Sequence, residues 1–439
     1  MLRIAGGSGR LRGTLEPPGD KSLTHRSFLM AALAHGTSRI VGANGGDDCR
    51  RLLAALGALG VGVSGEPPDE VVIVGRGVEA WRSPDAPLDL GNSGTALRLL
   101  AGAIAGSGVA ATLTGDASLR ARPMLRIVEP LRKMGARIDG EDGGRLAPLV
   151  VRGGEPGARL RGIRYLSPVP SAQVKSAILL AGLGAADATS VVEPAPSRDH
   201  TERMLKSLGA QLAFCDGTAR LTPGRPLNPL AWLVPRDPSG AAFFLAAACL
   251  LPGSEVVARL VSTNPTRLGF VDVLRRMGAD VETAGDLVVL REPSGDVTAR
   301  GGRSLAATVV PARDVPSLVD EIPILAVVAA CAEGKTRFEG VAELRVKESD
   351  RLAAIEAGLC AFGAWAEVDD DALVVYGGAP ERLRGAAIDS GGDHRIAMAF
   401  AILGLVATGE TTISDAEMIE TSYPGFEATL EALRRGGGA

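Results

Sequence analysis

The segment that decides the fold reads Pro18-Gly-Asp-Lys-Ser-Leu-Thr-His-Arg26 and is followed by an apolar run that extends to Gly36. Pro-Gly breaks any preceding element, and the hydroxyl of Ser22 or Thr24 can cap a helix. The segment therefore predicts a loop that leads directly into a helix, with Gly36 as its C-terminal stop.

Two cations of this segment, Lys21 and Arg26, lie close to the predicted helix N-terminus. Unpaired backbone N–H groups and the helix dipole make such a site positive, so added cations are unfavourable unless an anion is bound. The pattern leaves two readings open, which are an anion-binding site and a pair of solvated surface charges.

The same arrangement, a polar loop before a short Ala-rich apolar helix, occurs five more times along the chain. The loops are 91–94, 171–175, 237–240, 320–321 and 393–395, and the apolar runs after them extend to Gly108, Gly184, Gly253, Gly334 and Gly409. Spacings of roughly 70–85 residues indicate an internal repeat that is too long for a solenoid.

A second marker, an apolar residue followed by Gly, recurs with the same period at the end of amphipathic segments. It stands at Gly60, Gly135, Gly209, Gly278 and Gly363. Each repeat is thus expected to hold one helix that is apolar all round and buried, and one amphipathic outer helix, with short strands after each. Six such α/β units predict two bodies of three units, with the break near residues 235–238.

Composition limits the classes of function. The chain has 439 residues, 46% of them hydrophobic and only 3% aromatic, and its net charge is −4. These values argue against nucleic-acid and membrane binding, so we expect no partner of either kind. The five cysteines form no CxxC motif and fit a reducing cytoplasm, and the four histidines show no metal-ligand spacing, so we expect no metal and no cofactor.

Charged residues gather at or near the repeated loops. The densest group is Arg345-Val-Lys-Glu-Ser-Asp-Arg351, and Asp320-Glu321 opens one of the buried helices. Lys and Arg at several loops suit a ligand with several negative groups. Glu348 and Asp320 are candidate proton-transfer groups, although an ion-paired helix start and a dipole-complementing acid explain them equally well.

These motifs together resemble the enolpyruvyl transferase family, and within it the branch that acts on shikimate 3-phosphate. The resemblance covers essentially the whole chain. It is carried by residues 18–26, 90–95, 122–123, 171–177, 198–201, 320–323, 345–351 and 393–395.

The resemblance implies a two-domain inside-out α/β barrel built from six βαβαββ-type repeats, three per domain, with the active site in the cleft between the domains. The discontinuous C-terminal-half domain would comprise residues 1–19 and 237–439, and the other domain residues 20–236. The implied reaction transfers the enolpyruvyl group of phosphoenolpyruvate to the 5-hydroxyl of shikimate 3-phosphate and releases phosphate, in aromatic amino acid biosynthesis. We expect domain closure, a monomer and a cytoplasmic location.

The resemblance also assigns residues. Asp320 would be the base on the 5-hydroxyl, and Glu348 and Lys21 would manage the protons at C3 and on the leaving group. The substrate-binding residues would be Lys21, Ser22, Arg26, Asn92, Gly94, Arg122, Ser171, Gln173, Arg198, Asp320, Lys347, Arg351 and Arg395.

Some positions depart from the family pattern. A Ser and a Tyr that bind phosphate in many members correspond to Pro194 and Ser197, so Arg198 is expected to supply that charge. Two alternatives stay open: a UDP-N-acetylglucosamine enolpyruvyl transferase, which typically uses a Cys near Arg122 that is missing here, and a non-catalytic anion-binding repeat protein.

Overall fold

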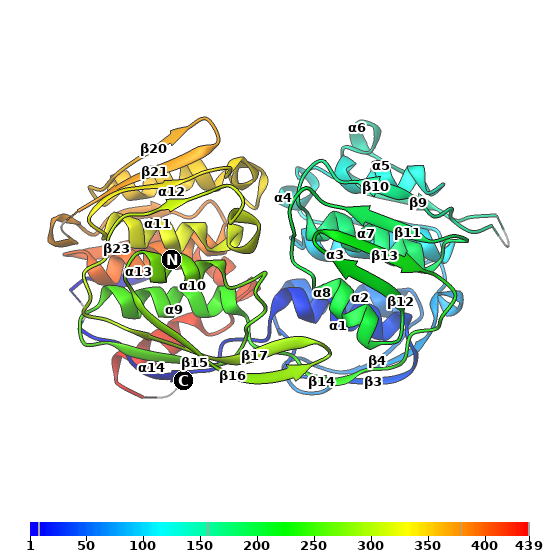
Figure 1. Cartoon of the computed structure of the whole chain (residues 1–439), viewed down its shortest axis with the longest axis horizontal. Coiled ribbons are helices and arrows are strands. Elements are labelled where there is room, and N and C mark those ends of the chain that lie inside the picture. The colour runs from blue at the N-terminus through cyan, green and yellow to red at the C-terminus, as the bar shows by residue number, and fades with distance from the viewer. Residues whose placement is uncertain (8, 156–157, 379, 438–439) are drawn as a thin grey trace. The chain divides into compact units, whose positions relative to one another are not determined.

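The computed structural model describes residues 1–7, 9–155, 158–378 and 380–437. The chain divides into two compact units (Figure 1). Each unit has its own hydrophobic core. Unit 1 comprises residues 1–18, 235–287 and 293–439, and unit 2 comprises residues 19–234 and 288–292. No helix among the described residues is long and apolar enough to cross a membrane.

Unit 2 contains three four-stranded sheets with the orders β14-β3-β5-β4, β6-β7-β9-β8 and β10-β11-β13-β12. In each sheet the first pair is parallel and the two others are antiparallel. The strands are β3 (His35–Val41), β4 (Gly62–Gly65), β5 (Val71–Arg76), β6 (Leu88–Asp89), β7 (Ala111–Thr114), β8 (Arg137–Gly140), β9 (Leu146–Arg152), β10 (Arg164–Leu166), β11 (Thr189–Val192), β12 (Gln211–Cys215), β13 (Thr218–Thr222) and β14 (Ala231–Leu233).

Unit 1 contains the sheets β18-β19-β21-β20, β16-β17-β15-β2 and β1-β23-β22. Its strands are β1 (Leu2–Ala5), β2 (Arg12–Leu15), β15 (Glu255–Ser262), β16 (Asp280–Val289), β17 (Glu292–Arg300), β18 (Val309–Val310), β19 (Gly334–Phe338), β20 (Trp365–Asp369), β21 (Ala372–Gly377), β22 (Ala387–Asp389) and β23 (Glu410–Ser414). The tip of the β16–β17 hairpin, residues 288–292 (here called the 288–292 turn), belongs to unit 2.

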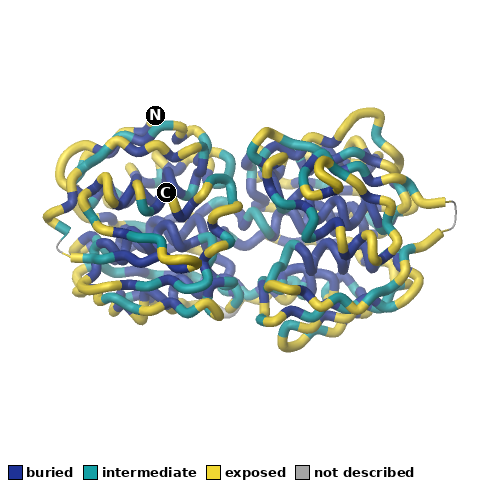
Figure 2. Tube along the Cα trace, turned by 90° about the horizontal axis from the view of Figure 1, so that it is seen from above, coloured by how far each residue is buried: buried dark blue, intermediate teal, exposed yellow. Residues whose placement is uncertain are grey.

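Six buried helices follow the six repeated loops. They are α1 (Lys21–Leu33), α3 (Gly94–Ser107), α7 (Ala172–Leu183), α9 (Pro238–Leu250), α11 (Ile322–Ala330) and α13 (His394–Val406). Almost every residue of these helices is buried, as predicted from their apolar sequence (Figure 2). The loops therefore place their polar residues at the N-termini of core helices.

The amphipathic helices form the second set. They are α2 (Asp47–Ala58), α5 (Leu125–Lys133), α8 (His200–Ser207), α10 (Gly269–Arg276), α12 (Arg351–Ala361) and α14 (Phe426–Arg434). Short helices complete the chain: α4 (Ala117–Arg120), α6 (Glu141–Gly144) and the 3-10 turns Val78–Ala80, Val315–Ser317, Val319–Glu321, Ala342–Val346, Pro380–Arg382 and Ala416–Thr421.

Two local predictions for the first helix are wrong. The cap is Asp20, whose carboxylate accepts a hydrogen bond from the Leu23 N–H at 2.7 Å, and not Ser22 or Thr24. The helix ends at Leu33, and Gly36 lies inside β3 with φ 134°. The glycine at this position therefore permits a positive φ within the strand and does not end the helix.

Candidate functional site

The predicted site residues fall into two groups, one in each compact unit. In unit 2 they lie on α1, in the first turns of α3 and α7 and on the loops before these helices, after α4 and before α8. In unit 1 they lie before α11, on the 342–350 segment, at the start of α12 and on α13. Nearly all therefore stand at or close to a helix N-terminus, where backbone N–H groups and the dipole favour anions.

Lys21 is the first residue of α1, and its ammonium donates a hydrogen bond to Asp48 at 2.9 Å. Its backbone carbonyl accepts a hydrogen bond from Nδ1–H of the buried His25 at 2.7 Å. The other ring nitrogen, Nε2, lies 3.1 Å from the Ser93 hydroxyl, which also caps α3. Burial lowers the pKa of His25 to about 4, so the imidazole is neutral and Ser93 donates to it.

Arg26 is buried and points across α1 toward α7 and α8. Its Nε donates to the Thr201 hydroxyl at 2.8 Å and one terminal nitrogen donates to Ser176 at 3.2 Å. Burial lowers the pKa of the guanidinium to about 10, and the nearby positive charge of Arg198 acts in the same direction. Two cations held close together in this way suit a doubly charged phosphate.

A second cationic group surrounds Gly94 at the start of α3. A Cβ at this position would lie 3.1 Å from Arg98 and 3.4 Å from Arg122, so only glycine leaves both guanidinium groups undisturbed. Arg98 donates to the Gln173 side chain at 2.5 Å, and Arg122 donates to the Asn92 side chain. These contacts bring together four predicted site residues from three loops.

In unit 1, Asp320 is surrounded by three cations. The nitrogens of Lys347, Arg351 and Arg395 lie 3.9, 3.5 and 3.9 Å from its carboxylate oxygens. Burial lowers the pKa of the Lys347 ammonium, although the charge of Asp320 opposes this shift. The group therefore combines a carboxylate with three positive charges, which suits proton transfer beside an anionic ligand.

Arg351 organises this group. Its guanidinium pairs with Asp393 at 2.7 Å and with Glu348 at 2.6 Å, and its side chain is 1% exposed. Burial opposes the charge of Arg351, but the surrounding carboxylates outweigh that effect and raise its pKa. Burial also opposes ionisation of Asp393, yet Arg351 lowers its pKa, so the pair is ionised.

Sequence reasoning missed the partners that hold these residues, chiefly Asp48, Glu193 and the imidazole of His25. All three side chains are polar and buried. Asp48 binds Lys21 across 27 positions, Glu193 binds Lys175 across 18, and His25 contacts Ser93 across 68, so the spacing of these pairs in the sequence gives no signal. His25 stands inside the quoted segment, yet only the fold shows that it faces Ser93.

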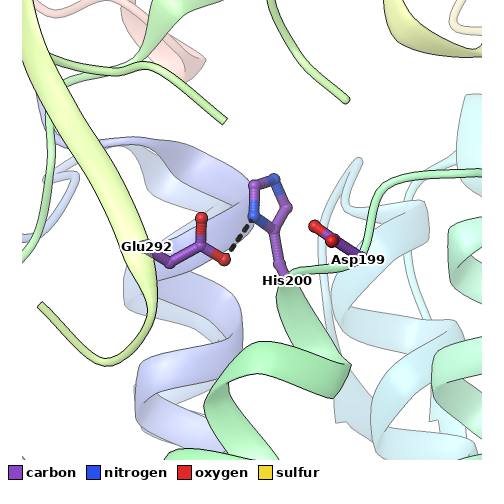
Figure 3. A group of neighbouring side chains, drawn as sticks. All are labelled: Asp199, His200 and Glu292. Carbon is purple, nitrogen blue, oxygen red and sulfur yellow. Dashed lines mark hydrogen bonds and ion pairs between the residues drawn. The ribbon is translucent and has the colours of Figure 1, made fainter. Parts of the chain in front are cut away.

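The structure also brings together Asp199, His200 and Glu292, whose possible metal-ligand atoms lie within 4.8 Å of one another (Figure 3). His200 Nδ1 and Glu292 form a hydrogen bond of 2.8 Å with both side chains fully buried, and Arg203 pairs with Asp199 at 2.8 Å. The carboxylate of Glu292 therefore binds His200 Nδ1 and that of Asp199 binds Arg203, whereas the buried Nε2 of His200 has no hydrogen-bond partner among the described residues. The cluster explains how the 288–292 turn is held against α8.

The fold and these two charged groups define a two-unit α/β protein that presents cations and carboxylates at the ends of buried helices, a class suited to small anionic substrates. The model of the EPSP synthase (3-phosphoshikimate 1-carboxyvinyltransferase) family matches residues 6–430, and the chain belongs to this family.

Individual relatives agree with this membership. The 3-phosphoshikimate 1-carboxyvinyltransferase of Roseiflexus castenholzii is 48% identical over 429 residues, 97% of this chain and 98% of the relative. That of Gloeobacter violaceus is 48% identical over 427 residues, 97% of each chain. A solved EPSP synthase structure from Acinetobacter baumannii superposes with a TM-score of 0.86 at 40% identity, covering 98% of this chain and 97% of that one.

Proposed function

We propose that this chain transfers the enolpyruvyl group of phosphoenolpyruvate to the 5-hydroxyl of shikimate 3-phosphate and releases phosphate, as a step of aromatic biosynthesis. The family match over residues 6–430 and relatives of the same name at 46–48% identity support the reaction. The observation that carries the assignment of roles is Asp320, a carboxylate with three cations within 3.9 Å.

The proposed mechanism is addition followed by elimination. Asp320 takes the proton of the attacking 5-hydroxyl, and Glu348 and Lys21 handle the proton at C3 of phosphoenolpyruvate and the proton on the departing phosphate. Fixed cations stabilise the negative charge that develops on the phosphate and carboxylate groups, because they need no reorganisation during the reaction. No step requires a metal or an organic cofactor.

The proposed binding residues divide by substrate. Phosphoenolpyruvate is held by Lys21, Gly94, Arg122, Gln173, Arg351 and Arg395. Shikimate 3-phosphate is held by Ser22, Arg26, Ser171, Gln173, Asp320 and Lys347, with Asn92 and Arg198 as further substrate-binding residues. The paired cations Arg26 and Arg198, and the pair Arg98 and Arg122 beside Gly94, are consistent with two separate anionic groups.

The finer architectural predictions belong to this proposal. Strand orders that repeat from sheet to sheet support six βαβαββ-type repeats in an inside-out barrel, three in each domain. The proposed domains are residues 20–236, and residues 1–19 with 237–439. A monomeric state and a cytoplasmic location likewise stay predictions.

Phosphate release tests the proposal directly. With both proposed substrates the wild type is expected to release phosphate, and none is expected when UDP-N-acetylglucosamine replaces shikimate 3-phosphate. Asp320→Asn and Glu348→Gln keep the side-chain shape but remove the proton-transfer group, so each should lower kcat by about 10²–10⁴-fold. Glu427→Gln, an exposed change on α14 of the same unit, is the matched control.

The outcomes separate the alternatives. Release with the nucleotide sugar alone would assign the chain to the other branch of the enolpyruvyl transferases. Binding of shikimate 3-phosphate and phosphoenolpyruvate without release, or full activity of both carboxylate variants, would contradict the proposed mechanism.

A further inference from the structure

A buried carboxylate outside the proposed site joins two of its loops. Glu193 follows β11, and its side chain is fully buried. Its oxygens accept hydrogen bonds from the Ser171 backbone N–H at 2.8 Å, from the Ser197 hydroxyl at 2.7 Å and from the Lys175 ammonium at 2.6 Å. Ser171 caps α7, whose first turn carries Gln173, and Ser197 directly precedes Arg198.

Lys175 connects this carboxylate to a second one. Its ammonium lies 2.8 Å from Glu202 on α8, and all three side chains are almost completely buried. Burial opposes the charge of Lys175, but the two carboxylates outweigh it and raise the lysine pKa. The pKa of Glu202 is raised by burial, in keeping with a cluster of two acids and a single base.

The cluster also reaches Arg26. Ser176, next to Lys175, contacts the Thr201 hydroxyl at 2.7 Å, and Thr201 is next to Glu202. Both hydroxyls accept hydrogen bonds from Arg26. The buried ions therefore fix α7 against α8, and the two helices together fix the guanidinium of Arg26.

Stability alone is a weak reason for this arrangement. Burying three charged groups carries a large desolvation cost, and apolar side chains of similar volume often stabilise a core as well or better. What apolar side chains cannot do is accept three directed hydrogen bonds from two loops at once. The desolvation cost of the cluster is explained if its role is to fix the geometry of the two loops.

We propose that Glu193, balanced by Lys175 and Glu202, is a positioning residue that sets the Ser171 and Arg198 loops for shikimate 3-phosphate. This inference rests on the proposed function, and Glu193 itself does not touch the substrate. The proposed phosphoenolpyruvate residues Lys21 and Arg122 are held by other partners, Asp48 and Asn92. The side chain of Gln173, which is proposed to contact both substrates, is held by Arg98 and Thr95 and not by Glu193. Loss of Glu193 should therefore affect one substrate far more than the other.

The test is Glu193→Gln in the full chain, with steady-state kinetics in each substrate. Glutamine keeps one acceptor oxygen, but an NH₂ group replaces the other. At least one of the donors that bind Glu193, which are Ser171 N–H, Lys175 and the Ser197 hydroxyl, therefore loses its acceptor and faces another donor. KM for shikimate 3-phosphate should rise at least tenfold, which corresponds to a loss of about 1.4 kcal/mol in binding free energy. Both kcat and KM for phosphoenolpyruvate should stay within about twofold of the wild-type values. Calorimetric titration with shikimate 3-phosphate alone should show the same loss.

Two further variants keep the test decisive. Ser197→Ala removes one hydrogen bond from Glu193 without unbalancing the buried charges, so it should fold even if Glu193→Gln does not and should raise the same KM by a smaller factor. Glu129→Gln, at an exposed position of α5, is the matched control and should change neither KM.

The outcomes of these measurements are distinguishable. An active wild type whose Glu193 and Ser197 variants lose only thermal stability, or show equal rises in both KM values, would overturn the positioning role alone. A wild type that neither binds shikimate 3-phosphate nor releases phosphate would overturn the proposed function, and the positioning role with it.

Discussion

At the scale of single residues, His25 shows how a buried side chain can organise charged neighbours without carrying charge. Its Nδ1–H donates a hydrogen bond to the Lys21 carbonyl, and its Nε2 accepts a hydrogen bond from the Ser93 hydroxyl. The neutral imidazole thus joins the N-terminus of α1 to that of α3. A protonated ring would lose the acceptor and would place a further positive charge beside Lys21.

This predicts a pH dependence of stability. The unfolded imidazole titrates near pH 6.5 and the folded one near pH 4, so between these values the unfolded state binds a proton that the folded state does not. The contribution of His25 should be fully present above pH 6.5 and should be lost as the pH falls to 4, by about 3 kcal/mol in the free energy of unfolding.

Urea unfolding of the wild type and of His25→Gln at pH 7 and pH 4.5 measures this contribution. Glutamine does not titrate, so the variant should lose distinctly less stability between the two pH values. Equal losses in both proteins would show that His25 is not kept neutral by the fold.

At the scale of helices and strands, local sequence predicted where the core helices begin but not where they end. All six begin at the polar loops that the repeats marked. Of the expected glycine stops, Gly108 and Gly184 do cap α3 and α7, whereas α9 ends at Leu250, before Gly253. Gly108 caps α3 with φ 76°, Gly184 caps α7 with φ −91°, and Gly253 has φ 74° outside its helix, so a glycine by itself does not mark a helix end.

The strand orders and the buried partners of the site residues could not be predicted from the sequence, because they depend on contacts between segments that are distant in the chain. The parallel pairing of β6 with β7 and the contact of Arg26 with Thr201 join segments separated by a helix or by far more of the chain. The charged residues themselves were found because they stand in recognisable motifs. What holds them depends on packing, which periodicity does not encode.

Close packing of α3 against α7 gives a prediction at this scale. A Cβ at Gly102 would lie 2.3 Å from the Ala177 carbonyl oxygen, whereas a Cβ at Gly57, an exposed position of α2, would meet nothing within 4 Å. Gly102→Ala should therefore reduce the free energy of unfolding by about 1–3 kcal/mol, because the two backbones must separate. Gly57→Ala should increase it by roughly 0.5–1 kcal/mol through its helix propensity.

Chemical denaturation of both variants measures these opposite changes in the free energy of unfolding. A Gly102→Ala protein as stable as the wild type would mean that α3 and α7 can move apart without cost.

At the scale of the whole molecule, unit 2 is completed by five residues from a distant part of the chain. The 288–292 turn supplies Glu292, whose carboxylate is fully buried and hydrogen-bonded to His200 on α8. Its backbone also contributes, since the Arg291 carbonyl accepts a hydrogen bond from Arg203 at 2.8 Å.

Glu292→Ala should therefore loosen α8, because it leaves the buried Nδ1–H of His200 without its acceptor at a cost of about 1–3 kcal/mol. Native-state hydrogen exchange should show reduced protection for α8 amides and no change in α13. Glu282→Gln, an exposed change on the same hairpin, serves as control and should leave both helices unaffected. Unchanged protection of α8 in Glu292→Ala would contradict the role of this turn.

The pairing of β1 with β23 sets an order of events during translation. Leu2 lies opposite Ile413, so β1 obtains its partner only after about 400 further residues have been synthesised. At about 5–20 residues per second, residues 2–5 wait for tens of seconds. The core of unit 2 needs little beyond residue 234 and can form well before that moment. In this interval β1 lacks its sheet partner, and chaperones and proteases have access to it.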